Sequence, residues 1–98
     1  MNKFKIVKPL DGYGGHGDET IYDVLPIEDV SLRGYRVGCR TCLGRVSQSI
    51  HYPGETLRYY AFGTSNPNYM SLKHEDFMYT FCSRACLDLF QLNPLAYE

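Results

Sequence analysis

Four cysteines in two close pairs constrain this chain more than any other feature. Cys39 and Cys42 have two residues between them, and Cys82 and Cys86 have three. A tetrahedral metal site collects its ligands in this way, from two short turns that each supply two sulfurs. The pattern therefore predicts one structural zinc ion held by Cys39, Cys42, Cys82 and Cys86.

The pairing alone leaves two other uses of the cysteines open. They could form two disulfides in a secreted protein, or they could remain unliganded inside the core. Residues 1–10 do not combine a basic stretch with an apolar segment of the length that a signal peptide needs. We therefore expect a reduced, cytoplasmic protein whose sulfurs hold a metal.

The residues around the second pair predict a strand that runs into a helix. Residues 78–81 are apolar, aromatic or β-branched, which is typical of a short strand that ends at Cys82. Ser83 is placed to cap the helix, with its hydroxyl accepting a hydrogen bond from the backbone N–H of Cys86. A proline two residues further on predicts that the helix ends near Leu92.

These residues carry a resemblance to a known group of families. The chain resembles the treble-clef zinc fingers grouped as TRASH, YHS and MYM-type domains in the run Phe81-Cys82-Ser83-Arg84-Ala85-Cys86, followed by Phe90, Pro94 and Tyr97. In those families a Cys-x2-Cys turn supplies the first two ligands, and the junction of a strand and a helix supplies the last two. The resemblance implies an α+β fold, a small zinc-stabilised treble-clef domain with antiparallel β-hairpins and one C-terminal helix.

The rest of the chain predicts short strands and turns in one domain, 1–98. We expect an N-terminal strand and a glycine-rich loop (11–18) within residues 1–36, and a treble-clef core over 37–98. A long hairpin is predicted from residues 45–52 and 56–62, and an irregular or short helical link over 69–77. Further strand-like segments lie at 3–7, 21–25, 30–33 and 35–37.

Charge is balanced overall but unevenly placed along the chain. The formal net charge of the 98 residues is −1, which argues against a surface built as a whole to meet phosphate groups. Residues 18–29 contain acidic but no basic side chains, and residues 33–45 contain arginines but no acidic ones. The two segments either neutralise each other or form a bipolar surface that orients a partner.

Nothing in the sequence predicts an enzyme. A site closed by four thiolates has no open coordination position for water or substrate. His51 and His74 are not close in sequence to any cysteine, so neither is expected to be a ligand. We therefore expect no catalytic residue, no cofactor other than zinc and no small-molecule substrate.

Binding is the expected role, and the expected partner is a protein. The sequence favours a zinc-stabilised interaction module, a small accessory subunit or adaptor of a larger complex, because tyrosines give large contact area at low entropic cost. The expected partner surface comprises Arg33, Arg36, Arg45, Arg58, Tyr59, Tyr60 and Phe62.

Two alternatives remain open. Single-stranded nucleic acid could bind, with aromatic side chains stacking on bases and arginines holding phosphates. The family resemblance also suggests metal sensing or trafficking. No membrane association is expected, because no apolar run approaches the length of about 20 residues that a spanning helix requires.

Overall fold

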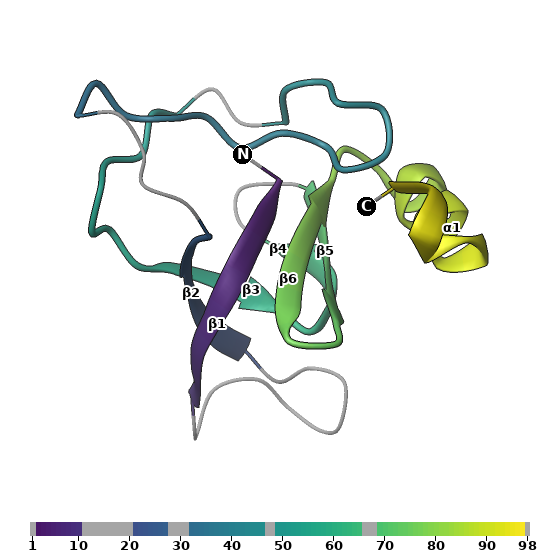
Figure 1. The fold of residues 1–98 in the computed structure, drawn as a ribbon, viewed down its shortest axis with the longest axis horizontal. Coiled ribbons are helices and arrows are strands. Elements are labelled where there is room, and N and C mark those ends of the chain that lie inside the picture. Colours follow the sequence, from purple (N-terminus) through teal and green to yellow (C-terminus); the bar gives the residue numbers. More distant parts are fainter. Residues whose placement is uncertain (1, 11–20, 28–31, 47–48, 66–68, 98) are drawn as a thin grey trace.

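The computed structural model describes residues 2–10, 21–27, 32–46, 49–65 and 69–97. Six strands are followed by two C-terminal helices (Figure 1). The elements are β1 (Lys3–Leu10), β2 (Ile21–Pro26), β3 (Leu57–Tyr60), β4 (Phe62–Ser65), β5 (Tyr69–His74), β6 (Phe77–Phe81), the α-helix α1 (Arg84–Leu92) and the short 3-10 helix η2 (Pro94–Tyr97). No helix in these described ranges has the length and apolar character needed to cross a membrane.

The strands form one antiparallel sheet that curls into a nearly closed barrel. Their order is β3-β2-β1-β6-β5-β4, so the two edge strands are β3 and β4. These edges are consecutive in the chain, with only Ala61 between them, and the Ala61 carbonyl accepts a hydrogen bond from the Lys73 backbone N–H at 2.7 Å. Gly63, at φ +136°, adopts a conformation that side-chain-bearing residues rarely take. Because β3 and β4 follow each other in the chain, the backbone passes directly from one edge of the sheet to the other.

β1 is the central connector of the barrel. It pairs with β2 along its length and with the far end of the chain through β6, where Phe4 lies opposite Met78. The register along β2 shifts between Ile6 and Lys8. Such a bulge adds bend and twist to a strand, which helps a small sheet to curl.

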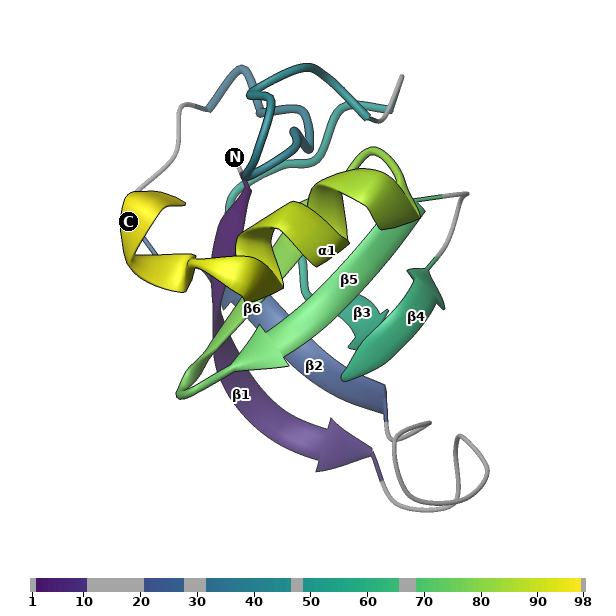
Figure 2. The ribbon, with the colours of Figure 1, turned by 90° about the vertical axis from the view of Figure 1, so that its right-hand side faces the viewer.

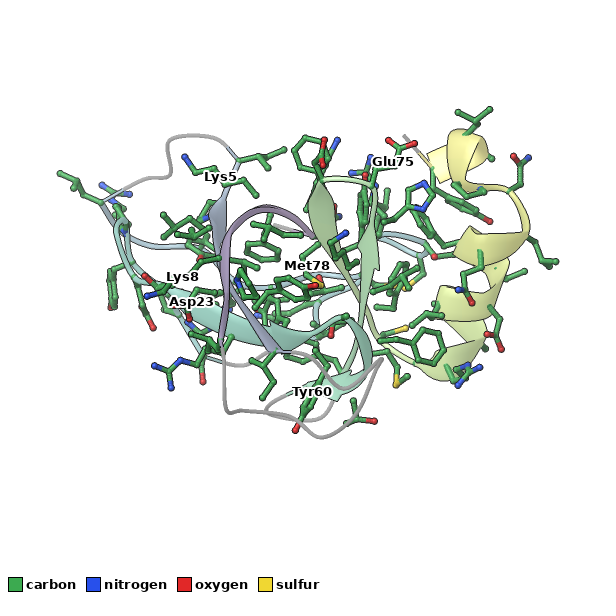
Figure 3. All side chains as sticks on the ribbon, turned by 90° about the horizontal axis from the view of Figure 1, so that it is seen from below. Lys5, Lys8, Asp23, Tyr60, Glu75 and Met78 are labelled. Carbon is green, nitrogen blue, oxygen red and sulfur yellow. The ribbon has the colours of Figure 1, made fainter. Side chains whose placement is uncertain are left out.

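The barrel interior is filled mainly by aromatic and aliphatic side chains. The cluster consists of Phe4, Val24, Val37, Leu57, Tyr59, Tyr69 and Met78. Figure 3 shows the molecule from below, with Met78 near the centre of the packed side chains. Two tyrosine hydroxyls meet inside this cluster, because the Tyr69 hydroxyl donates a hydrogen bond to that of Tyr59 at 2.7 Å. We call this cluster the barrel interior.

α1 lies outside the barrel and packs against β5 and β6 (Figure 2). Leu87 and Phe90 are its buried residues. They join a second cluster with Leu72, Tyr79, Phe81 and Cys39. The second cluster therefore connects the helix to the sheet and includes one of the four cysteines.

The predicted treble clef is wrong. The chain is mostly a six-stranded antiparallel sheet with one C-terminal α-helix, and it is not clearly a treble clef. A treble-clef prediction rests on short-range patterns around the cysteines. The decisive pairing joins β1 to β6, at opposite ends of the sequence, and no local pattern encodes such a contact.

Two predicted elements also differ. The long hairpin is absent from the described residues, because Arg45 and His51 make only isolated bridges and β3 pairs with β2 instead. The link predicted over 69–77 is instead strand β5 (69–74), a turn at 75–76 and the first residue of β6. Within β5, Ser71 is buried and its hydroxyl bonds to the Tyr60 carbonyl. The glycine-rich loop (11–18) lies outside the described residues, as does part of the predicted strand at 30–33. The extent of the domain, 1–98, remains a prediction.

Candidate metal centre

The four cysteine sulfurs converge at one place in the fold. All four lie within 4.8 Å of one another, and the cysteines are free. The Sγ of Cys82 is 3.6 Å from that of Cys42 and 3.4 Å from that of Cys86. Four sulfurs at about 2.3 Å from a tetrahedral zinc would be about 3.8 Å apart, so the spacing fits one ion. The cluster can therefore hold a metal, as the cysteine spacing predicts.

The first two sulfurs come from a tight turn, residues 38–45, which we call the knuckle. Its ends are joined by a bridge between Gly38 and Arg45, and the Cys39 backbone N–H bonds to the Gly44 carbonyl at 2.7 Å. Inside the turn, the backbone N–H of Cys42 points at the Cys39 sulfur, 3.5 Å away. The turn therefore brings both sulfurs to the same side.

The other two sulfurs come from the junction of β6 and α1. Ser83 caps the helix, and its hydroxyl accepts a hydrogen bond from the Cys86 N–H at 3.4 Å, as predicted. Because the cap fixes the first turn of the helix, Cys86 faces back toward Cys82. The helix also ends at Leu92, as predicted.

Hydrogen bonds attach the knuckle to the rest of the protein independently of any metal. The Arg40 backbone N–H bonds to the Thr80 carbonyl at 2.8 Å, and the Thr80 hydroxyl bonds to the Gly38 carbonyl at 2.7 Å. The Thr41 hydroxyl donates to the Cys86 carbonyl, also at 2.7 Å. The two halves of the metal centre are thus held together by backbone and side-chain contacts as well as by their sulfurs.

The sulfurs differ in their readiness to ionise. Burial opposes ionisation of Cys39, but backbone N–H groups around its sulfur, chiefly that of Cys42, lower its pKa to about 7. The hydrogen bond with Cys86 raises the pKa of the Cys82 thiol, and burial raises that of Cys86. Cys39 is therefore the first of these three to become a thiolate, and a metal must displace protons from the others.

The centre lies at the surface of the molecule. Cys39 is fully buried, whereas Cys42 and Cys82 are exposed and Cys86 is half-buried. Cys39 is part of the second cluster and Cys86 packs against it, whereas Cys42 and Cys82 face outward. A bound metal would therefore connect the packed core to the exposed turn.

The arginines inside the ligand loops make contacts away from the sulfurs. Arg40 donates a hydrogen bond to Asn2 Oδ1 at 3.1 Å and lies 5.5 Å from the centre of the Tyr79 ring. Arg84 pairs with Asp88 at 2.9 Å and lies over the Phe62 ring. Each arginine is thus held by groups other than the sulfurs.

The residues of the predicted partner surface differ in their exposure to solvent. Arg33, Arg36 and Arg45 are exposed. Arg58 is also exposed and pairs with the buried carboxylate of Asp23 at 3.4 Å. Tyr60 and Phe62 are half-buried. Tyr59, at 2% exposure, belongs to the barrel interior, so it cannot contact a partner in this fold.

The histidines are placed elsewhere. His51 Nδ1 lies 3.2 Å from Glu55 Oε1, and His74 packs edge-on against Phe90. In the part of the chain that the structure describes, the only cluster suited to a metal consists of the four cysteines.

One feature of the site was not predicted from the sequence. A cleft opens between the knuckle and η2, lined by Arg40, Thr41, Leu43, Ala96 and Tyr97. Leu43, an exposed leucine directly after the second cysteine, was the available signal. Comparison with known proteins gives no further guidance, because no protein-family model, curated protein or solved structure matches this chain. The resemblance to the TRASH, YHS and MYM-type domains is thus supported by the cysteine cluster alone.

Proposed function

We propose that this chain is a zinc-stabilised interaction module, a small accessory subunit or adaptor that binds a protein partner and catalyses no reaction. The observation that carries the proposal is the four-sulfur cluster that joins the knuckle to the start of α1. Four protein ligands fill a tetrahedral shell and leave no position for a substrate, as in structural zinc sites. The soft thiolate donors suit zinc among the common divalent ions.

The position of the cluster supports a structural role for the metal. Only Cys39 is buried within the knuckle, and residues 42–45 are all exposed. An exposed turn gains little stability from apolar burial, so a metal would supply what packing does not. The ordered knuckle would then present a fixed surface to a partner.

The experiment combines metal analysis with partner capture. Wild-type chain is expected to carry one zinc per molecule and to enrich one defined partner from its native host, measured by quantitative mass spectrometry. Cys39→Ser is expected to lose both the zinc and the partner. Arg84→Gln, which changes an exposed side chain outside the sulfur set, serves as the control and is expected to keep both. Enrichment that survives loss of the metal would contradict the proposal.

A second candidate function, metal sensing or trafficking, is favoured by one observation, the exposure of Cys42 and Cys82. A protein that delivers metal must release it while folded, and exposed sulfurs permit attack by an acceptor. Exchange of bound zinc with a coloured chelator separates the two candidates. A structural site is expected to exchange at the rate of local unfolding, and rapid exchange with the fold intact would favour trafficking.

A further inference from the structure

The cleft between the knuckle and η2 has a mixed lining. Its volume is about 280 Å³, and its walls are Arg40, Thr41 and Leu43 on one side and Ala96 and Tyr97 on the other. The Thr41 hydroxyl is already engaged by the Cys86 carbonyl. What the cleft offers a ligand is thus one guanidinium beside aliphatic and aromatic surface.

Leu43 lines the cleft in a backbone conformation that costs the folded protein free energy. Its backbone lies in the left-handed region, at φ 65°, where residues with a β-carbon are uncommon. Its side chain is 76% exposed, so burial does not offset this conformation. Glycine or asparagine would suit the position better in an isolated domain. Strained residues of this kind cluster at binding sites, because contact with a ligand offsets their cost.

Arg40 supplies the only charge among the five lining residues, and it is held in place. One terminal nitrogen donates to Asn2 Oδ1, and the guanidinium lies beside the Tyr79 ring. The Asn2 side chain in turn reaches the Cys39 carbonyl at 3.5 Å. Because this guanidinium is anchored and none of the five lining residues in the described part of the chain is acidic, the complementary group on an unmodified peptide is a carboxylate.

The size of the cleft distinguishes among possible occupants. A volume of about 280 Å³ accommodates one or two side chains. A stable dimer of two copies buries on the order of 800 Å² on each partner, which is a much larger and flatter contact. The cleft therefore suits a short peptide segment better than a second copy of the chain.

We propose that this cleft binds a peptide segment of a protein partner, with a carboxylate on Arg40 and an adjacent aliphatic or aromatic side chain between Leu43 and Tyr97. This inference rests on the proposed function and names the surface through which the protein partner would bind. The zinc site then has a second consequence, because the turn that binds the metal through Cys39 and Cys42 also positions Arg40 and Leu43.

The test uses a library of random twelve-residue peptides displayed on phage and selected against the zinc-loaded full chain. The enriched peptides are expected to share an acidic group next to a leucine, isoleucine or phenylalanine. A selected peptide, synthesised with a free and with an amidated C-terminus, separates a terminal carboxylate from an aspartate or glutamate side chain. Loss of binding on amidation would identify the terminal group.

Matched variants locate the binding surface. Leu43→Ser and Arg40→Gln are each expected to weaken peptide binding at least tenfold. Their controls are Leu92→Ser, which changes a leucine that is 81% exposed and outside the cleft, and Arg84→Gln, which removes an exposed arginine outside the cleft. Both controls are expected to bind within twofold of wild type.

Leu43→Gly adds a readout that a merely structural leucine would not give. This variant relieves the left-handed conformation, so it is expected to melt at or above the wild-type temperature while losing peptide binding. A lower melting temperature would contradict the inference.

The outcomes separate this inference from the proposed function. If the enriched peptides bind Leu43→Ser and Arg40→Gln as tightly as wild type, the cleft is not their binding site and this inference is wrong. The proposed function as an interaction module would be unaffected. A dimer in light scattering that Leu43→Ser dissociates would assign the surface to a second copy and also overturn the inference. A selection that enriches no peptide overturns it as well, whereas a partner captured independently of zinc overturns the proposed function.

Discussion

The barrel interior and the knuckle are stabilised by different means. The barrel interior brings together buried side chains from five strands and Val37, all at 9% exposure or less. Within the knuckle only Cys39 is buried, and residues 42–45 are exposed. Apolar burial contributes roughly 25 cal/mol per Å², so it can stabilise the barrel but not the turn. The turn is therefore held by hydrogen bonds, and a metal bound to its sulfurs would add to them.

The second cluster is where the two regions meet. Cys39 packs there with Phe81 from β6 and with Leu87 and Phe90 from α1. One side chain is thus both a candidate metal ligand and a core residue. We therefore expect loss of the metal to loosen the knuckle and the start of α1 before the barrel interior.

The largest effect is expected from Cys39→Ser. The variant removes a ligand and places a hydroxyl in the second cluster, so it should lose the zinc and on the order of 5 kcal/mol of stability. Metal analysis and chemical denaturation measure both effects. Cys42→Ser, at an exposed ligand, is the matched comparison: it should also lose the zinc but leave the packing around Cys39 intact.

Removing zinc with a chelator sharpens the comparison without mutation. Amide hydrogen exchange is expected to speed up in residues 38–45 and in the first turn of α1, while the amides that pair β1 with β2 remain protected. Uniform loss of protection in both regions would show that the metal supports the whole fold equally.

Phe4→Ala tests the other region. Phe4 is fully buried and packs edge-on against Tyr59, so its truncation should cost about 3–5 kcal/mol of stability. Zinc content per folded molecule should stay at one, because the ring lies in the barrel interior and not in the second cluster. Loss of zinc in this variant would contradict the separation of the two regions.

Alkaline pH should destabilise the barrel but not the knuckle, because buried tyrosines lie in and beside the barrel interior and the knuckle contains none. Burial raises the pKa of Tyr35 and Tyr69 to about 12, and that of Tyr59 well above its ordinary value. Tyrosines in an unfolded chain ionise near 10, so the folded state holds these protons more tightly. The stability they contribute is complete below about pH 10 and is lost as the pH rises through about 12.

Tyr69→Phe provides the check on this pH dependence. It removes one of the raised groups, so thermal stability between pH 10 and 12 should fall less steeply than in wild type. Zinc content should not follow this titration, because the knuckle contains no tyrosine. If thermal stability fell as steeply between pH 10 and 12 in Tyr69→Phe as in wild type, Tyr69 would not contribute to this pH dependence.

The smallest effect is expected at the helix cap. Ser83→Ala removes the acceptor of the Cys86 N–H and should cost about 1 kcal/mol of stability. Because Cys86 is in the first helical turn, the variant should also exchange zinc faster while still binding one ion. Ser83→Asp, which restores an acceptor, should recover both properties, and failure to recover them would show that the hydroxyl is not acting as a cap.

The metal site could be predicted from the sequence because its determinants are local. Two short spacings identify the cysteines, and Ser83 caps the helix by a bond to a residue three positions away. β6 likewise shows its strand character in consecutive residues. In such cases the interacting groups lie within a few residues of each other, so periodicity and turn chemistry are sufficient.

The barrel could not be predicted because its determinants are distant in sequence. Phe4 meets Met78 across the sheet, and no local pattern records that pairing. β5 was predicted as an irregular or short helical link, and its polar Ser71 is buried with its hydroxyl bonded to the Tyr60 carbonyl. Tyr59 shows the same limit, since its place on a predicted hairpin suggested a contact surface, and it is buried in the barrel interior instead.

X-ray absorption at the zinc edge tests the central claim most directly, because it reports the number and type of atoms bound to the metal. The purified, reduced chain should contain one zinc with four sulfur neighbours at about 2.3 Å and no oxygen or nitrogen neighbour. Cys42→Ser should lose the zinc and, with it, that signal. A wild-type spectrum with fewer than four sulfurs, or folded protein that contains no zinc, would contradict the account.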